Sequence, residues 1–236
     1  MFRYYFIRFF MRLIQHILLL SITVFGKENI PGKGPYIVVL NHTSVVDTPV
    51  LMLAFPPMKW SFFAVDKWRT HPIYGPIMGW LGAIYVKRGE VDRATLRQAM
   101  NAIKDGMVFG LAPEGTRSAT GSLLEARDGA AYLASRANVP ILPVGIVNND
   151  RLFTNFKKFR RTRAEIHIGE PFMLPELGRR AKGADLTAYT HLIMAKIAAQ
   201  LPESYHGVYA ASPAVAALQR GEEAWPYCYE PLLTQS

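Results

Sequence analysis

The sequence is poor in cysteine: its 236 residues contain one, Cys228. A single thiol excludes an internal disulfide, a cysteine-rich metal site and a Cys-x-x-Cys redox pair. A chain of this length can bury enough apolar surface to fold without such cross-links. A reducing compartment fits this composition. We also expect that the protein uses no metal and no other cofactor.

Charged residues are also scarce, at 19% against 50% hydrophobic residues, yet the repeated long apolar runs of a polytopic membrane protein are missing. Acids are fewer than bases, which gives a formal net charge of +9. Such a charge favours anionic partners, namely membrane phospholipid, nucleic acid or phosphorylated small molecules. No nucleic-acid reading motif is present, so we expect no nucleic-acid partner.

The first 25 residues lack acids, and their longest uncharged run, Leu13 to Phe25, is shorter than the roughly 20 residues of a membrane span. On a helical wheel Arg8 and Arg12 fall on one side, and aromatic and aliphatic residues cover much of the rest. Residues 1–28 are therefore predicted to form an amphipathic helical segment that lies on the cytoplasmic face of a membrane, with its arginines on lipid phosphates. A tilted span, a cleaved signal peptide and a buried core helix remain alternatives.

Residues 29–35 are rich in glycine and proline and should end that segment. Beyond them, short apolar runs alternate with helical patterns, which predicts an α/β domain over residues 29–205 and a C-terminal tail over residues 206–236. We expect a mostly parallel or mixed central sheet flanked by helices. The predicted strands are Tyr36–Leu40, Ser61–Val65, Ala83–Val86, Val108–Leu111, Ile141–Val147 and Ala164–Ile168. The predicted helices are Asp92–Asp105, Ser122–Asn138 and Leu186–Leu201.

A histidine and an aspartate follow the first of these strands, in Asn41-His42-Thr43-Ser44-Val45-Val46-Asp47. His42 suits general-base chemistry because imidazole titrates near neutral pH, and Asp47 could orient the ring. Five residues along one ideal helix would turn the two side chains roughly 140° apart. The pair can therefore meet only if His42 lies in the loop and Asp47 in the first helical turn. A purely structural alternative is that Ser44 and Asp47 form a capping box.

A second polar group follows the strand that ends at Leu111: Glu114-Gly115-Thr116-Arg117-Ser118. Arg117 offers a fork of donors matched to phosphate, Gly115 allows backbone amides to approach an anion, and the hydroxyls add donors. Lys87 and Arg88 end another strand and suit a second phosphate contact. A simple Glu114–Arg117 pair and surface charge are the structural alternatives.

The stretch Phe156-Lys157-Lys158-Phe159-Arg160-Arg161-Thr162-Arg163 places five cations and two phenylalanines in eight residues. It suits anionic headgroups, the phosphates of an acyl donor or nucleic acid. A solvated basic loop explains it equally well.

Taken together and in this order, Asn41-His42 to Asp47, Lys87-Arg88, Glu114 to Ser118 and Val139 to Ile146 resemble the four motif blocks of the PlsC-like glycerolipid acyltransferases. The best-known members of that family are 1-acylglycerol-3-phosphate acyltransferases. The resemblance covers about residues 20–205. It implies that His42 and Asp47 are the catalytic pair of an HX4D motif, and that an N-terminal helical motif seats the enzyme on the bilayer. It also implies that the phosphate-bearing acceptor is bound by Arg88, Glu114, Gly115, Thr116 and Arg117. From the same segments we add Asn41, Lys87 and Ser118 as expected substrate-binding residues.

The implied reaction moves an acyl group from acyl-CoA or acyl-carrier protein to 1-acylglycerol 3-phosphate, which gives phosphatidic acid for phospholipid biosynthesis. The expected partners are then a membrane surface, a lysophospholipid acceptor and the acyl donor. Glycerol 3-phosphate, another lysophospholipid or a lyso-amino-lipid are alternative acceptors. A non-catalytic membrane protein that only binds lipid is the alternative of a different class.

Overall fold

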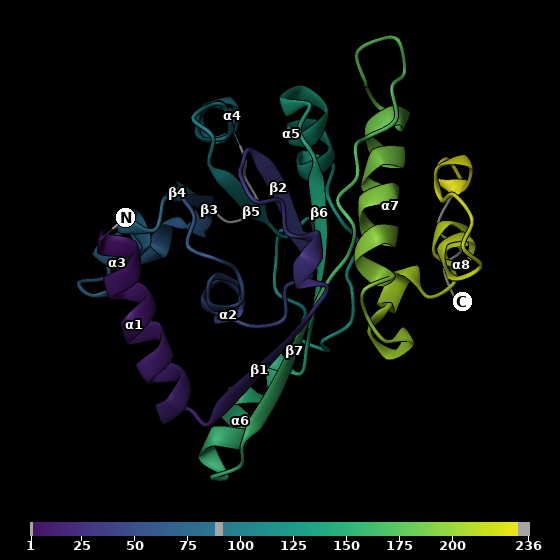
Figure 1. Cartoon of the computed structure of the whole chain (residues 1–236). Coiled ribbons are helices and arrows are strands. Elements are labelled where there is room, and N and C mark those ends of the chain that lie inside the picture. The colour runs from purple at the N-terminus through teal and green to yellow at the C-terminus, as the bar shows by residue number, and fades with distance from the viewer. Residues whose placement is uncertain (1, 88–91, 231–236) are drawn as a thin grey trace.

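The computed structural model describes residues 2–87 and 92–230, and within them seven strands form one sheet in the order β1-β7-β6-β2-β5-β3-β4 (Figure 1). The predicted α/β fold with a mixed central sheet is confirmed, and all six predicted strands are present within two residues of their expected ends. The strands are β1 (Leu20–Phe25), β2 (Tyr36–Leu40), β3 (Trp60–Val65), β4 (Ala83–Val86), β5 (Val108–Leu111), β6 (Ile141–Val147) and β7 (Thr162–Ile168).

The five strands β6, β2, β5, β3 and β4 run parallel to one another, whereas β7 pairs antiparallel with β6 and parallel with β1. The loops that leave the carboxyl ends of the five parallel strands therefore share one edge of the sheet with the starts of β1 and β7. This edge is called the catalytic edge below.

Both faces of the sheet are buried, and so the central strands are apolar at every position. In β2, Ile37 and Val39 contribute to one hydrophobic cluster, and Tyr36, Val38 and Leu40 contribute to the other.

The helices are α1 (Phe2–Ile17), α2 (Asp47–Ala54), α3 (Tyr74–Trp80), α4 (Arg93–Lys104), α5 (Gly129–Ala137), α6 (Leu152–Lys157), α7 (Ala184–Ala198) and α8 (Pro213–Gln219). The first three cover one face, and α4, α5 and α7 cover the other, with α8 outside α7 (Figure 1).

The N-terminal segment differs from the expectation of a helical segment up to residue 28. The helix α1 ends at Ile17, and Leu20–Phe25 instead form the edge strand β1, in register with Thr162–His167 of β7. Leu20–Phe25 are apolar because alternate residues, Leu20, Ile22 and Val24, pack into the hydrophobic cluster on one face of the sheet. The first 28 residues therefore include a strand of the sheet.

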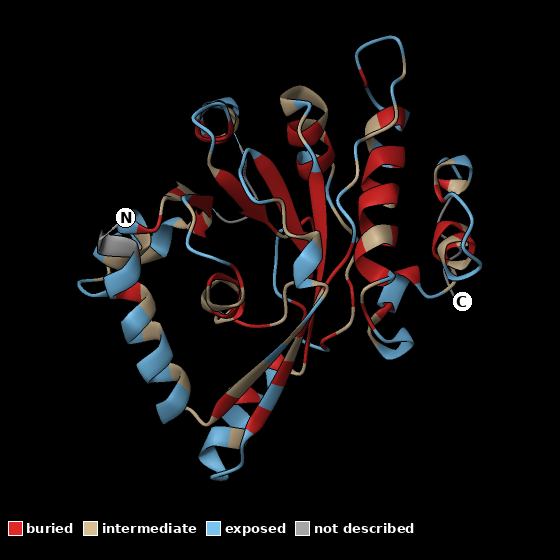
Figure 2. Cartoon of the chain, in the orientation of Figure 1, coloured by how far each residue is buried: buried red, intermediate tan, exposed pale blue. Residues whose placement is uncertain are grey.

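The helix α1 packs on α2, and much of the rest of it is exposed (Figure 2), including Phe6, Phe9 and Phe10. The guanidinium of Arg8 donates hydrogen bonds of 2.6–2.8 Å to the carbonyls of Met52, Leu53 and Phe55 at the end of α2. The expectation that Arg8 contacts lipid phosphate is therefore wrong, because this side chain caps a helix whose last carbonyls lack partners. No helix among the described residues has both the length and the hydropathy that crossing a membrane requires.

Two other boundaries differ from the predictions. The helix expected from Ser122 begins only at Gly129, because the amides of Leu123 and Leu124 bond to the Tyr205 carbonyl and to Glu114 rather than within a helix. The C-terminal segment does not lie free of the domain, because Tyr209, Val215 and Cys228 are buried in the cluster that contains α7.

Candidate active site

His42 lies in the loop after β2, and Asp47 is the first residue of α2, which is the arrangement that their spacing requires. His42 Nδ1 is 2.8 Å from Asp47 Oδ2. A buried carboxylate at that distance favours the tautomer with hydrogen on Nδ1, which leaves Nε2 as the basic nitrogen. The His42 side chain is 31% exposed and that of Asp47 1%, so the base can be reached while its partner is shielded.

Four donors surround the Asp47 carboxylate. Its Oδ2 accepts the His42 ring and the backbone N–H groups of Thr43 (2.8 Å) and Ser44 (2.9 Å). Its Oδ1 accepts the side-chain amide of Asn149 at 2.6 Å. A polar group this deeply buried needs such hydrogen-bond partners, because burying it without them is costly. Sequence reasoning missed Asn149. The signal was the polar run that begins at Asn148, directly after a strand that ends on the catalytic edge.

The segment Glu114 to Ser118 bonds to both backbone polar groups of His42, its N–H and its carbonyl. One carboxylate oxygen of Glu114 accepts the His42 N–H at 2.8 Å, and the other accepts the Leu124 N–H at 2.9 Å. The Ser118 N–H donates to the His42 carbonyl at 2.8 Å. The loop after β5 therefore fixes the loop that carries the base.

Glu114 is 2% exposed, and this burial raises the pKa of its carboxyl above the ordinary value, while the two backbone hydrogen bonds act in the opposite direction. The carboxylate oxygens face N–H groups of the protein. If Glu114 also binds the acceptor, as the resemblance implies, it must do so with the hydrogen-bonding capacity that its two oxygens retain beside these backbone bonds.

The remaining predicted acceptor residues are distributed as follows. The Asn41 side chain is buried and bonds to both backbone polar atoms of Ile146, so it ties β2 to β6. Gly115 has φ +66°, which favours glycine, and its N–H donates to the Ala112 carbonyl. The Ser118 hydroxyl pairs with that of Thr120 at 3.2 Å. Thr116 and Arg117 are exposed. Arg88 lies outside the described residues.

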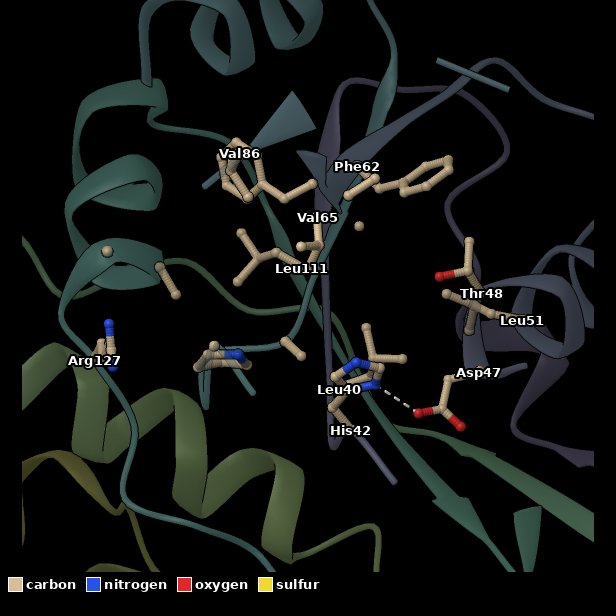
Figure 3. Close-up of a pocket in the computed structure, with 18 of the residues that line it drawn as sticks. Leu40, His42, Asp47, Thr48, Leu51, Phe62, Val65, Val86, Leu111 and Arg127 are labelled. Carbon is tan, nitrogen blue, oxygen red and sulfur yellow. Dashed lines mark hydrogen bonds and ion pairs between the residues drawn. The ribbon is translucent and has the colours of Figure 1, made fainter. Parts of the chain in front are cut away.

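A cavity of about 210 Å³ opens beside His42 (Figure 3). Most of its lining is apolar and comes from α2, from the length of β3 and from the ends of β2, β4 and β5, with smaller parts of α4 and α5. Leu40, Leu51, Phe62, Val65 and Leu111 are among the lining residues. His42, Asp47, Lys87 and Gly115 line it, whereas Asn41, Glu114, Thr116, Arg117 and Ser118 do not. No residue of β6 is in the lining, because that strand is buried in the core.

Two cations belong to the lining, Lys87 after β4 and Arg127 just before α5. In Figure 3 Arg127 lies across the cavity from Asp47 and Thr48. Its side chain passes beside Gly115, since a Cβ on that glycine would be 3.6 Å from Arg127 Cδ. Sequence reasoning missed Arg127. Among the described residues, no three His, Cys, Asp or Glu side chains are grouped as metal ligands would be.

The family model described as Acyltransferase matches residues 21–147, a span that contains His42, Asp47 and Glu114. The 1-acyl-sn-glycerol-3-phosphate acyltransferase of Saccharomyces cerevisiae is 31% identical over 72% of this chain and 57% of its own length. The protein of that name in Borreliella burgdorferi is 27% identical over 57% of this chain and 54% of its own length. The chain thus spans little more than half of these two relatives.

A solved structure of similar fold is the 1-acyl-sn-glycerophosphate (LPA) acyltransferase PlsC from Thermotoga maritima. It has a TM-score of 0.61 and 29% identity, over 72% of this chain and 68% of that one. Because the family model covers more than half of the chain, with the base, its carboxylate and the loop that holds them inside the matched region, the chain belongs to the acyltransferase family.

Proposed function

We propose that this chain transfers a fatty acyl group from acyl-CoA or acyl-carrier protein to the free hydroxyl of 1-acylglycerol 3-phosphate, forming phosphatidic acid for phospholipid biosynthesis. The observation that carries the proposal is the His42–Asp47 pair, fixed at the wall of an apolar cavity that also has two cations in its lining. The names of the relatives support the choice of acceptor.

In the proposed reaction His42 Nε2 takes the proton of the acceptor hydroxyl while the oxygen attacks the thioester carbonyl. The new C–O bond forms, the C–S bond breaks, and the departing thiolate receives the proton from the imidazolium. Asp47 stabilises that imidazolium and holds the ring. A positioned general base of this kind is worth about a hundred- to ten-thousand-fold in rate. No covalent acyl-enzyme is required.

The apolar lining suits part of a fatty chain, and Lys87 and Arg127 are the proposed contacts of the acceptor phosphate. The resemblance also implies a role for Arg117, which is exposed and outside the lining. Arg127→Gln and Arg117→Gln form a matched pair that separates these assignments. We expect Arg127→Gln to raise the acceptor KM by about tenfold or more, because a charged hydrogen bond is worth roughly 1.5–3 kcal/mol. A rise confined to Arg117→Gln would remove Arg127 from the phosphate site.

The outward face of α1 is the proposed seat on the cytoplasmic face of the membrane. It exposes a continuous set of large apolar side chains: Phe6, Phe9, Phe10, Leu13, Ile14 and Ile17, each 44–65% exposed. A contiguous set of exposed apolar side chains marks an interaction surface, and an amphipathic helix with aromatic residues suits the lipid interface.

The reaction is tested by release of free CoA thiol from acyl-CoA, in a panel that offers 1-acylglycerol 3-phosphate, glycerol 3-phosphate, other lysophospholipids and a lyso-amino-lipid. A second panel replaces the donor with acyl-carrier protein. His42→Ala is the blank, and it should remain folded, which thermal unfolding checks. Near-normal turnover by His42→Ala would refute the mechanism. Stoichiometric lipid binding without thiol release would show a non-catalytic lipid-binding protein instead.

A further inference from the structure

The turn between α6 and β7 carries four cations around one aromatic residue. Lys157, Lys158, Arg160 and Arg161 are exposed, and Phe159 between them is 89% exposed, the largest value among the exposed large hydrophobic residues of the described chain. Phe159 also has φ +53°, an uncommon conformation for a bulky residue. Its ring therefore projects from the turn rather than packing against the domain. These five residues are called the basic turn.

The basic turn lies on the catalytic edge, because β7 runs antiparallel to β6. The segment that leads to it starts at Asn149, whose amide bonds to Asp47, and continues directly into α6. The turn is thus attached, through a few residues of helix, to the carboxylate that orients the base.

The basic turn also adjoins the end of α1. The Thr162 N–H donates to the Leu19 carbonyl at 3.0 Å, and Leu20 pairs with Thr162 where β1 and β7 begin. Figure 1 shows α6 and the end of α1 together at the same end of the molecule. An apolar surface, ending in the exposed Ile17, therefore meets a strongly basic one that has an aromatic residue at its tip.

We propose that the basic turn is a second membrane contact, specific for anionic lipid. Phe159 enters the interfacial layer, and the four cations bind lipid phosphates around it. Contact at α1 and at the turn together directs the catalytic edge towards the bilayer, from which a lipid acceptor arrives. An acidic carrier protein would suit the charges as well. The basic turn leads into Thr162, which bonds to Leu19 just after α1, and this closeness to the apolar end of α1 favours a lipid surface.

The inference builds on the proposed seating of α1 and is separable from it and from catalysis. The full-length protein is tested for binding to vesicles of phosphatidylcholine alone and of phosphatidylcholine with about one third phosphatidylglycerol, a fraction chosen to give a clearly negative surface. The test variant is Lys157→Gln/Lys158→Gln/Arg160→Gln. The control is Lys33→Gln/Lys59→Gln/Lys104→Gln, which removes three exposed cations located just before β2, β3 and β5, at the opposite edge.

Both variants remove three of the charges that contribute to the formal net charge of +9. We expect the turn variant to lose roughly a hundredfold in partitioning to anionic vesicles at low salt, because each cation near such a surface contributes about fivefold. The control should lose far less, and binding to neutral vesicles should change little in either variant. The wild-type preference for anionic vesicles should fade in about 1 M salt, where the Debye length is near 3 Å. Phe159→Ser should weaken binding to both kinds of vesicle.

Equal losses in the two triple variants would overturn the proposal, since net charge alone would then explain binding. Unchanged binding by the turn variant would show a solvated loop. Loss of binding to an acidic carrier protein, with vesicle binding retained, would assign the turn to a protein partner.

Phe9→Ser/Phe10→Ser tests α1 separately and should weaken binding to neutral and anionic vesicles alike. Thiol release with a short-chain, monomeric acceptor should stay within about twofold in the turn variant, so a failure of the proposed reaction would be seen independently.

Discussion

Glu114 provides a sharp test of how the site works, because the resemblance and the structure assign it different roles. The resemblance places it in acceptor binding. In the structure its two carboxylate oxygens accept the backbone N–H groups of His42 and Leu124 at 2.8 and 2.9 Å, and it is 2% exposed. Removing the carboxylate should therefore disturb the position of the base rather than contact with the acceptor.

The expected size follows from these two bonds. Glu114→Ala leaves two buried N–H groups without partners, at about 1–3 kcal/mol each, and relieves the cost of burying a carboxylate. Glu114→Gln keeps the shape but can accept only one of the bonds, so about half of that loss is expected. A base displaced by about 1 Å can lose on the order of a hundredfold in rate. We expect kcat to fall on that scale in Glu114→Gln, with the acceptor KM changed by less than about threefold.

The assay measures kcat and the acceptor KM by thiol release, together with the free energy of unfolding in urea. Glu125→Gln is the matched control, because Glu125 is an exposed carboxylate in the segment that Glu114 holds. An acceptor KM raised tenfold or more at unchanged kcat would refute the positioning role and restore Glu114 to acceptor binding.

The same residue predicts a pH dependence of stability. Burial raises the pKa of Glu114 in the folded protein, so the folded state binds its proton more readily than the unfolded state does. Its contribution is then fully present below the ordinary carboxyl value and is lost as pH rises through the raised one. The wild type should lose stability relative to Glu114→Gln over that window, measured by urea unfolding at a series of pH values. A difference that is flat, or that grows in favour of the wild type, would show that the hydrogen bonds outweigh burial.

Two further predictions concern residues that sequence reasoning did not single out for function. Asn149→Ala should lower kcat by about tenfold and leave the acceptor KM nearly unchanged, because Asp47 loses one charged hydrogen bond but keeps the ring; an unchanged kcat would show that the backbone donors suffice. Cys228 is buried, and burial raises its pKa to about 12, so the native thiol should resist alkylation near pH 8 and react on unfolding. Rapid native labelling would show that the C-terminal segment does not stay packed on α7.

The elements that could be predicted are those whose pattern is local. A strand buried on both faces, such as β2 or β6, is apolar at almost every position and bounded by breakers, so its ends are visible in the sequence. The edge strand β1 could not be predicted, because Leu20–Phe25 continue an apolar run from α1 and become a strand only by pairing with β7, some 140 residues away. The reversal of β7 is equally nonlocal, and it places the basic turn on the catalytic edge.

Residue types in the site were predictable, but their partners were not. The position of Arg8 on a helical wheel indicates a polar side and cannot show whether that side faces lipid or the carbonyls of Met52 and Phe55. Glu114 was recognised in its motif, yet its contacts depend on how closely the loops after β2 and β5 approach. Such contacts are set by the assembled sheet, which short motifs do not encode.

The sequence left two interpretations of Asp47 as rivals, a cap partner of Ser44 or the orienting acid of His42. In the structure the N-cap residue of α2 is Val46, without a side-chain capping hydrogen bond, so no capping box forms. Asp47 Oδ2 accepts the Thr43 and Ser44 N–H groups in the loop before α2, and the same oxygen accepts the His42 ring. Because the N–H groups that hold the acid belong to the residues directly after His42, the loop cannot move without moving the acid. The hydrogen bonds from the Thr43 and Ser44 N–H groups to Asp47 are therefore the means by which base and acid keep their distance.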